Sequence, residues 1–145
     1  MIVLDEKDHA ILDVLKEDSS LSIQKIARKT GIPVATVHNR IKRMRAEGII
    51  SGYSIRLDKE KLGKKLVAYV LIKVMPKTDD LDLLGKVVKH GAVEIGSAVT
   101  GTFDLILKIR VADVDELNEF TLKYLKTFDE IADTQTMIAF KTIEK

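Results

Sequence analysis

Lysines and arginines gather in one stretch of the chain that contains no acidic side chain. Between Gln24 and Arg45 seven residues are Lys or Arg and none is Asp or Glu, whereas the whole chain of 145 residues carries a formal net charge of only +2. Ammonium and guanidinium groups gathered on one surface neutralise phosphates, which is the sequence-independent part of DNA binding. The stretch therefore predicts a surface for double-stranded DNA, with a solvated charged helix face as the simpler alternative.

Apolar residues around this stretch recur at helical spacings and predict three short helices. Asp5 can cap the first helix, Ser22 can cap the second, and Gly31 suits the left-handed residue that ends the second. Pro33 fits the first turn of a third helix, where its missing N–H costs nothing, and Gly48 ends that helix. The second and third helices then form a helix-turn-helix. The third helix carries an apolar seam that we expect to be buried, formed by Val34, Val37, Ile41 and Met44.

The other side chains of the third helix are candidates for DNA contact. A helix-turn-helix places its second helix in the major groove, and residues near the N-terminus of that helix meet the base edges. An asparagine can pair with adenine through two hydrogen bonds. The predicted base-edge contacts are Thr36, His38 and Asn39, with Ala35 on the same surface. The predicted phosphate contacts, which position a protein without reading sequence, are Arg28, Lys29, Arg40, Lys42, Arg43 and Arg45.

The apolar pattern changes after the third helix. An extended connector over 49–57 and a charged linker over 59–65 come first. After them, the apolar residues recur at the spacings of strands in some segments and of helices in others. The expected strands cover 66–75, 92–100, 103–111 and 131–143, and the expected helices cover 81–89 and 114–126. This βαββαβ order is that of a ferredoxin-like domain. The chain is thus predicted to be an α+β protein with a helix-turn-helix domain over 1–53, a hinge over 54–65 and a ferredoxin-like domain over 66–145.

The first expected strand carries information about assembly. Residues 66–72 are apolar on both faces of the pleat, and two helices can cover only one face of a four-stranded sheet. The second apolar face needs a partner, and a second copy of the chain is the simplest one. A symmetric dimer would present two recognition helices to a palindromic DNA site with half-sites about one helical turn apart.

A second candidate site lies between the expected strands 92–100 and 103–111. Gly101 can adopt a turn conformation that directs backbone N–H groups outward, and such donors suit an α-carboxylate. Asp104 carries the opposite charge and suits an α-ammonium group. The segment from Thr100 to Asp104, which includes Thr102 and Phe103, therefore predicts an amino-acid site. The alternative is a plain hairpin turn in which Gly101 supplies the bend and Asp104 bonds to the backbone of the turn.

Composition argues against several other classes of protein. No apolar run approaches the roughly 20 residues of a membrane helix, and the N-terminus lacks the features of a signal peptide, so a cytoplasmic location is expected. The chain has no Cys, which leaves no disulfide or thiolate chemistry. His9, His38 and His90 lie on different elements without a second ligand at metal-binding spacing. No nucleophile or nucleotide motif is present, so neither an enzyme nor a cofactor is expected.

Four segments, in order, resemble the Lrp/AsnC, or feast/famine, transcription regulators over essentially the full length of the chain. Residues 4–12 (LDEKDHAIL) resemble the family's LDxxDxxIL start, and residues 36–44 (TVHNRIKRM) resemble its recognition helix, TVxxRIxxL. Residues 48–53 (GIISGY) resemble GIIxGY at the hinge, and residues 100–104 (TGTFD) resemble the TGxYD segment of its effector-binding domain. Two segments depart from the family pattern. Pro33 stands where a Ser cap is common, and residues 128–131 replace a commoner Pro-Gly-Val.

The resemblance also implies how members of the family assemble and what they bind, which the spacing of apolar residues does not indicate. Members of the family dimerise through the C-terminal sheet (a RAM-type domain), often with help from a hinge strand. They commonly assemble into octamers or other rings, and many bind an amino acid between C-terminal domains. By this resemblance Asp133, Thr134 and Thr136 join the effector site, the two threonines from a neighbouring subunit.

Two alternatives to an amino-acid-sensing regulator stay open. Ligand-independent members exist, so the chain could be an architectural DNA-binding protein. Proteins that resemble the family also act as sirohaem decarboxylases, which need basic or His residues around a tetrapyrrole pocket in the C-terminal domain. His90 is the only histidine of residues 66–145.

Overall fold

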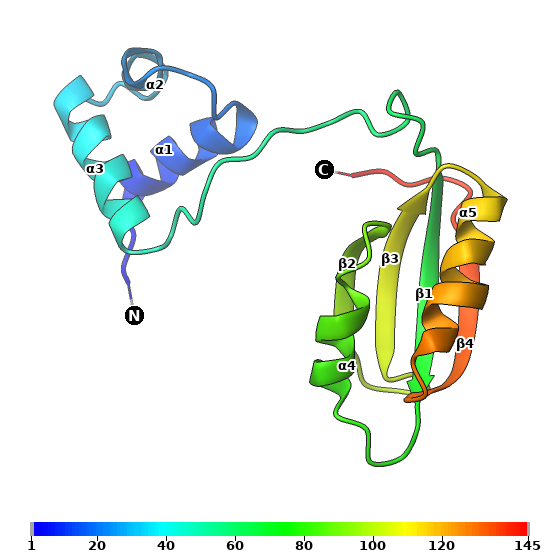
Figure 1. Ribbon diagram of the computed structural model, residues 1–145. Coiled ribbons are helices and arrows are strands. Elements are labelled where there is room, and N and C mark those ends of the chain that lie inside the picture. The colour runs from blue at the N-terminus through cyan, green and yellow to red at the C-terminus, as the bar shows by residue number, and fades with distance from the viewer. Residues whose placement is uncertain (1, 145) are drawn as a thin grey trace. The chain divides into compact units, whose positions relative to one another are not determined.

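The chain forms two compact units, one extending to Arg56 and one starting at Leu57 (Figure 1). The computed structural model describes residues 2–144. The first unit is entirely helical, and the second combines helices with a four-stranded antiparallel sheet, so the expected α+β class is confirmed. None of the helices within residues 2–144 is long and apolar enough to span a membrane.

Three helices make up the N-terminal unit, namely α1 (Glu6–Glu17), α2 (Ile23–Thr30) and α3 (Val34–Ala46). Asp5 caps α1, and the Ser22 hydroxyl accepts a hydrogen bond from the backbone N–H of Lys25 at 3.3 Å to cap α2. Gly31 ends α2 in the left-handed conformation, with φ of 70°, as its position predicts. Pro33 precedes α3 as its N-cap instead of entering its first turn, and no side chain caps that helix.

The core of this unit uses most of the predicted apolar positions. Val37 and Met44 are fully buried with Ile11 of α1, and Ile26 of α2 is almost fully buried. Val34, which the seam predicts to be buried, is 44% exposed. It is the first residue of α3, one turn before Val37, the first buried residue of that helix.

The C-terminal unit has the ferredoxin-like order of elements. Its strands are β1 (Leu66–Val74), β2 (Val93–Ala98), β3 (Leu105–Val111) and β4 (Ile131–Ile138), arranged β2-β3-β1-β4. All four predicted strands extended too far, because residues 75, 92, 99–100, 103–104 and 139–143 lie outside the strands.

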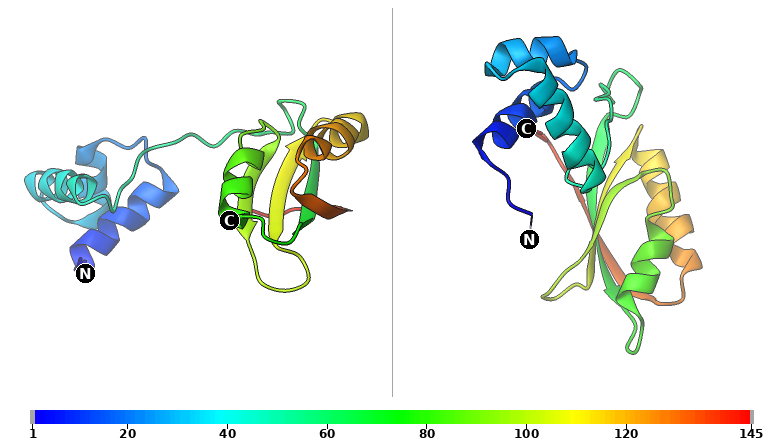
Figure 2. Two further views of the ribbon diagram at one scale, coloured as in Figure 1. Left: turned by 60° about the horizontal axis from the view of Figure 1, so that its bottom comes forward. Right: turned by 90° about the vertical axis from the view of Figure 1, so that its left-hand side faces the viewer.

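Two helical segments cover one face of this sheet (Figure 2, where α4 is green and the segment with α5 is yellow to orange). The first is α4 (Asp80–Val87). The second begins as α5 (Val114–Asn118), continues as a π-helical turn (Glu119–Tyr124) and ends as a 3-10 turn (Leu125–Thr127). The sequence predicts one regular helix there. Phe120 and Leu125 are both buried, and a spacing of five does not repeat on one face of an α-helix, whereas the extra residue of a π-turn brings both inward.

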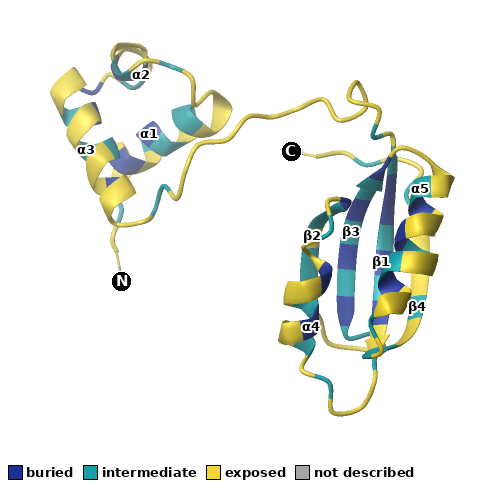
Figure 3. Ribbon diagram, viewed as in Figure 1, coloured by how far each residue is buried: buried dark blue, intermediate teal, exposed yellow. Residues whose placement is uncertain are grey.

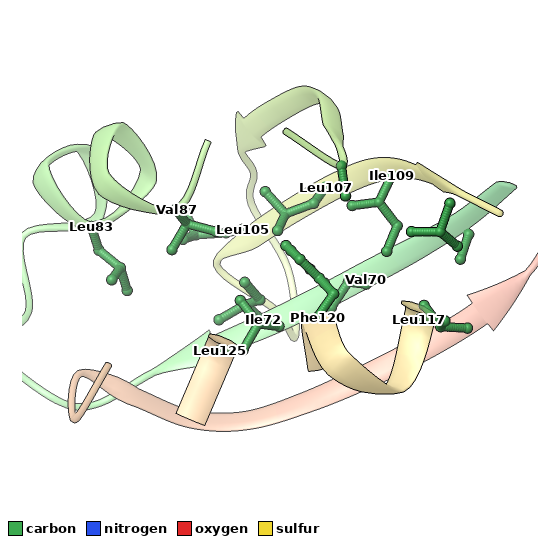
Figure 4. Packing of buried hydrophobic residues seen from close by; sticks show 13 residues of the cluster. Val70, Ile72, Leu83, Val87, Leu105, Leu107, Ile109, Leu117, Phe120 and Leu125 are labelled. Carbon is green, nitrogen blue, oxygen red and sulfur yellow. The ribbon is translucent and has the colours of Figure 1, made fainter. Parts of the chain in front are cut away.

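The core of the C-terminal unit lies between the sheet and these helices. Figure 4 shows Val70, Ile72 and Leu107 of the strands in one cluster with Leu83 of α4 and Phe120 of the second helical segment. Burial alternates along β3 and along β1 from Ala68 to Ile72 (Figure 3). At Gly96 of β2 a Cβ atom would lie 2.6 Å from a Val88 methyl group. A glycine therefore permits the close approach of the end of α4 to this strand.

The opposite face of the sheet is only partly apolar. Tyr69, Leu71 and Ile106 are half-buried there, and Ile95 is exposed. The same face carries a group of paired charges, in which Arg110 Nε lies 2.9 Å from a Glu94 carboxylate oxygen and Lys108 pairs with Glu94 and Glu144. No helix among the described residues of the C-terminal unit covers this face. Its burial by a second copy of the chain stays a prediction.

Candidate nucleic-acid interface and effector loop

The outward side of α3 carries most of the predicted base-contacting residues. Ala35, His38 and Asn39 are exposed, and Thr36 is half-buried on the flank of the helix. With 3.6 residues per turn, the exposed residues lie opposite the buried Val37. A shallow hollow of about 580 Å³ at this end of the helix is lined by Ile23, Gln24, Val34, Ala35, His38 and Asn39. The polar side chains with base-pairing capacity therefore surround one concave surface.

Four of the predicted phosphate contacts are exposed cations. Arg28 and Lys29 lie in the last turn of α2, and Lys42 and Arg45 lie in the second half of α3. None of the four forms an ion pair with another residue of 2–144. Arg45 lies over the ring of Tyr53, with its guanidinium carbon 5.7 Å from the ring centre. The charge of these four residues is available to an external anion.

Arg40 and Arg43 differ from these four because acids of α1 hold them. Arg40 Nη1 lies 3.0 Å from Asp8 Oδ1 and 2.5 Å from Asp5 Oδ2, and Arg43 Nη2 lies 2.6 Å from Asp8 Oδ2. Asp8 is 1% exposed and is the only buried charged residue among those described. Asp5 and Asp8 also exchange backbone-to-carboxylate hydrogen bonds of 3.0 and 3.1 Å, which form the capping box of α1. We call Asp5, Asp8, Arg40 and Arg43 the Asp8 cluster.

The hydrogen bonds of the Asp8 cluster keep both carboxylates ionised. Burial alone would raise the pKa of Asp8, but hydrogen bonds from the Asp5 N–H and from Arg40 and Arg43 outweigh burial and lower the pKa below its ordinary value. A hydrogen bond from Arg40 is the main cause that lowers the pKa of Asp5 to about 2. Hydrogen bonds to Asp5 and Asp8 in turn raise the pKa of Arg40.

Sequence reasoning missed the role of Asp8, although one signal was present. The acids lie 32 to 35 residues from their arginine partners, so no local spacing connects them. The segment LDEKDHAIL, which resembles the family start, contains both Asp5 and Asp8. A recurring pair of acids at a helix N-terminus was therefore visible, but its partners were not.

The predicted effector loop is a short connection between β2 and β3. Thr100, Gly101 and Thr102 are exposed, and Phe103 and Asp104 are half-buried. Gly101 has a φ of 120°, which favours glycine. Asp104 Oδ2 accepts a hydrogen bond of 2.8 Å from the backbone N–H of Val74 at the end of β1. This contact ties the loop to β1 and is not the bond to the turn backbone that the hairpin alternative predicts. Asp104 Oδ1 makes no hydrogen bond with residues 2–144.

Asp133 and Thr134 lie at the same end of the sheet as this loop. In the register, β1 residue Ile72 pairs with Leu105 of β3 on one side and with Thr134 of β4 on the other. Within one chain the loop and these β4 residues are thus two strands apart, roughly 10 Å. Thr136 pairs with Val70, one step further from the loop.

Lys73 lies between these two groups and was not among the predicted site residues. Its ammonium group donates a hydrogen bond of 2.9 Å to the backbone carbonyl of Thr102, and its register partner on β4 is Asp133. Lys73 is exposed and forms no ion pair with a carboxylate of residues 2–144. Lys73 could not be recognised from the sequence, because only the pairing of the strands brings this residue near the end of β1 beside the loop.

Comparison with known proteins agrees with the two units. Residues 4–51 match a family of winged helix-turn-helix DNA-binding domains, and residues 67–145 match the Lrp/AsnC ligand binding domain. The HTH-type transcriptional regulator FL11 of Pyrococcus furiosus is 32% identical over 139 residues, which cover 96% of this chain and 91% of that protein.

Solved structures give the same result. E. coli AsnC superposes with a TM-score of 0.91 at 25% identity, covering 99% of this chain and 97% of that one. A feast or famine regulatory protein from M. tuberculosis, complexed with L-methionine, superposes with a TM-score of 0.89 at 27% identity, covering 99% and 96%. The matched domains, the full-length relatives and the fold agree with the four sequence segments, and the chain belongs to the Lrp/AsnC family of DNA-binding transcriptional regulators.

Proposed function

We propose that this protein binds a specific, palindromic DNA site and that an amino acid bound at the C-terminal unit alters its DNA binding or assembly. The observation that carries the DNA part is the exposed side of α3, where His38 and Asn39 surround a hollow beside uncompensated cations. Two such helices in a symmetric dimer would match the two halves of a palindrome. Assembly of dimers into an octamer or another ring belongs to the same proposal.

Each exposed residue receives a separate role in this proposal. Asn39 reads a base edge, assisted by His38 and Thr36, because it is exposed in the first half of the helix. The four cations Arg28, Lys29, Lys42 and Arg45 neutralise phosphates and set the register on the duplex. Arg40 and Arg43 are a separate case, since Asp5 and Asp8 already hold their guanidinium groups.

Asn39→Ala tests sequence reading. A duplex enriched from random-sequence DNA by the wild-type chain is compared with a scrambled duplex of the same composition. We expect the variant to lose about 1 to 3 kcal/mol of preference for the enriched duplex, the value of one bidentate base contact. Asn118→Ala, which removes an exposed asparagine of α5 in the other unit, serves as the control. An equal loss of affinity for both duplexes would remove Asn39 from base reading.

The effector part of the proposal rests on three groups around the loop. The free Oδ1 of Asp104 suits an α-ammonium group, and the exposed backbone around Gly101 offers N–H donors to an α-carboxylate. Lys73 adds a cation beside the same loop, within reach of that carboxylate. Asp133 would join the site, and Thr134 and Thr136 of a neighbouring subunit would close it. Two structural relatives were solved with L-methionine, which supports an amino acid as the ligand class.

A thermal-shift screen against the twenty amino acids tests this site, because a ligand that binds only the folded form raises the melting temperature. We expect a rise with one or a few amino acids for the wild type and for the control Asp115→Asn, whose carboxylate is exposed on α5. Asp104→Asn keeps an acceptor for the Val74 N–H but loses the charge, so the rise should disappear. No rise for the wild type at millimolar concentration would favour a ligand-independent architectural protein, with residues 100–104 as a turn.

A non-enzymatic role is part of this proposal. His90, the only histidine of the C-terminal unit, packs with its ring 4.5 Å from that of Tyr124 and 5.0 Å from that of Phe120. Its Nδ1 accepts the backbone N–H of Ala92 at 3.1 Å. These contacts use the ring for packing and for closing a turn, which favours a regulator over a decarboxylase. A regulator of transcription would act in the cytoplasm, beside the DNA.

A further inference from the structure

We infer that Asp8 is a positioning residue for DNA recognition: its buried carboxylate holds Arg40, fixes the rotation of α3 about its own axis, and withholds Arg40 from the DNA phosphates. This inference uses the DNA-binding activity of the family but gives Arg40 a role that its position on a basic recognition helix does not suggest.

Charge balance within the Asp8 cluster is the first argument. Two carboxylates and two guanidinium groups meet there, so the Asp8 cluster carries no net charge. An ionised carboxylate that is 1% exposed is very unfavourable without partners. Transfer of Arg40 to a phosphate would leave Asp8 with only Arg43 and one backbone N–H. The pairing with Arg40 is therefore expected to persist in the DNA complex.

The position of Arg40 on the helix is the second argument. Arg40 follows Val37 by three residues and precedes Met44 by four, and both of those residues are fully buried. Its side chain is 22% exposed, whereas Lys42 lies on the outward side. Arg40 thus leaves α3 on the flank that faces α1, where Asp8 receives it. A side chain directed to α1 is poorly placed for a phosphate beside the outward side.

Rotation of α3 is what this contact controls. The apolar side chains of the seam can pack at several rotations of α3, whereas the hydrogen bonds between Asp8 and the arginines form at only one. The ion pair therefore opposes rotation of α3 about its own axis. Base-reading side chains must be held within about 10–20° of their productive direction. The hydrogen bonds of Asp8 therefore determine whether Asn39 and His38 point into the groove.

Asp8→Asn is the main test, in the full-length chain. The substitution keeps the shape and one oxygen acceptor but removes the charge of one of the two carboxylates that hold Arg40, which leaves the Asp8 cluster with one unit of net positive charge. We expect affinity for a scrambled duplex to rise, and the slope of log affinity against log salt to steepen by about 0.9, one additional phosphate contact. The ratio of affinities for the enriched and scrambled duplexes should fall by about tenfold, because a rotated helix loses a base contact.

This pattern separates positioning from mere loss of folding. A lower folded fraction would weaken binding to both duplexes by the same factor and leave the salt slope unchanged. That result would overturn the inference. Asp5→Asn gives a second test with a smaller risk to the fold, since the Asp5 side chain is 53% exposed and contributes one contact to Arg40. It should steepen the salt slope in the same direction, and an unchanged slope would count against the inference.

Arg40→Met and Lys42→Met form a matched pair on the same helix. We expect Lys42→Met to reduce the salt slope by about 0.9 per chain, the contribution of one phosphate contact. Arg40→Met should leave the slope at the wild-type value while lowering the preference for the enriched duplex. An equal reduction of the slope by both substitutions would show that Arg40 contacts a phosphate, and the inference would be wrong.

Discussion

Asp8→Ala is expected to lower the free energy of unfolding of the N-terminal unit by about 2 to 3 kcal/mol, because charged hydrogen bonds are lost while the two guanidinium groups left behind are partly exposed to water. Arg40 and Arg43 would keep their charges without the acid that satisfies them. The helix would also lose half of the capping box, because the Asp5 N–H donates to Asp8. A unit with a core as small as that around Ile11 and Met44 has few other contacts to offset this loss.

Hydrogen exchange followed by mass spectrometry measures this effect within the full chain. Amides of α1 and α3 should exchange faster in the variant, while those of β1 and β3 in the other unit serve as the internal reference. Asp13→Ala is the matched control, because Asp13 lies on the same helix, is 72% exposed and pairs with no residue of 2–144 other than Lys16. A similar acceleration in both variants would contradict a special role for Asp8.

Acid titration of the same proteins gives a second signature. The pKa of Asp8 is lowered in the folded state from 3.8, and that of Asp5 is lowered from 3.8 to about 2. The stability that these groups contribute is therefore fully present above about pH 4 and is lost as the pH falls through their folded-state pKa values. The wild type should lose stability of the N-terminal unit over this window, whereas Asp8→Ala should show a smaller loss.

Simultaneous replacement of four exposed cations by Ala is expected to remove most of the electrostatic attraction for DNA. The four are Arg28, Lys29, Lys42 and Arg45. Each Lys or Arg that neutralises a phosphate contributes about 0.9 to the slope of log affinity against log salt, so the slope should fall by about 3 to 4 for each chain bound. Fluorescence anisotropy with a scrambled duplex over a range of salt concentrations measures this slope.

The control for this variant removes the same charge from the other unit. Lys61, Lys89, Lys123 and Lys126 are all exposed there, and their replacement by Ala changes the net charge equally. We expect the control to change the slope by less than one contact, or about 0.9. Equal effects of the two quadruple variants would mean that DNA affinity depends on the total charge of the chain and not on the cations of α2 and α3.

Local features of the fold could be predicted because local physics sets them. Ser22 and Gly31 bound α2 through a side-chain cap and a left-handed residue, and both effects act within one turn of helix. The arrangement of strands in the C-terminal unit follows from the βαββαβ order that the strand-like and helix-like apolar patterns predict along the chain. Val34 was misassigned because periodicity gives the buried side of a helix but not the point at which its packing partners end.

Contacts between distant residues could not be predicted. Asp8 meets Arg40 and Arg43 only when α1 packs on α3, so the two arginines were assigned to phosphates on the basis of their charge. Lys73 reaches the loop at Thr102 only through the pairing of β1 with β3. The candidate effector residues themselves came from a resemblance as much as from spacing, and their role in ligand binding stays a prediction.

The π-helical turn has a consequence for how the length of this chain can change. It accommodates one residue more than an α-helix would, and exposed residues such as Leu122 and Lys123 lie within it. Loss of one of them would shorten the spacing from Phe120 to Leu125 from five to four, which an ordinary α-helix places on one side. Relatives with a one-residue gap here can therefore keep the same buried side chains, and an alignment that spreads this gap into β4 would misplace Asp133 and Thr134.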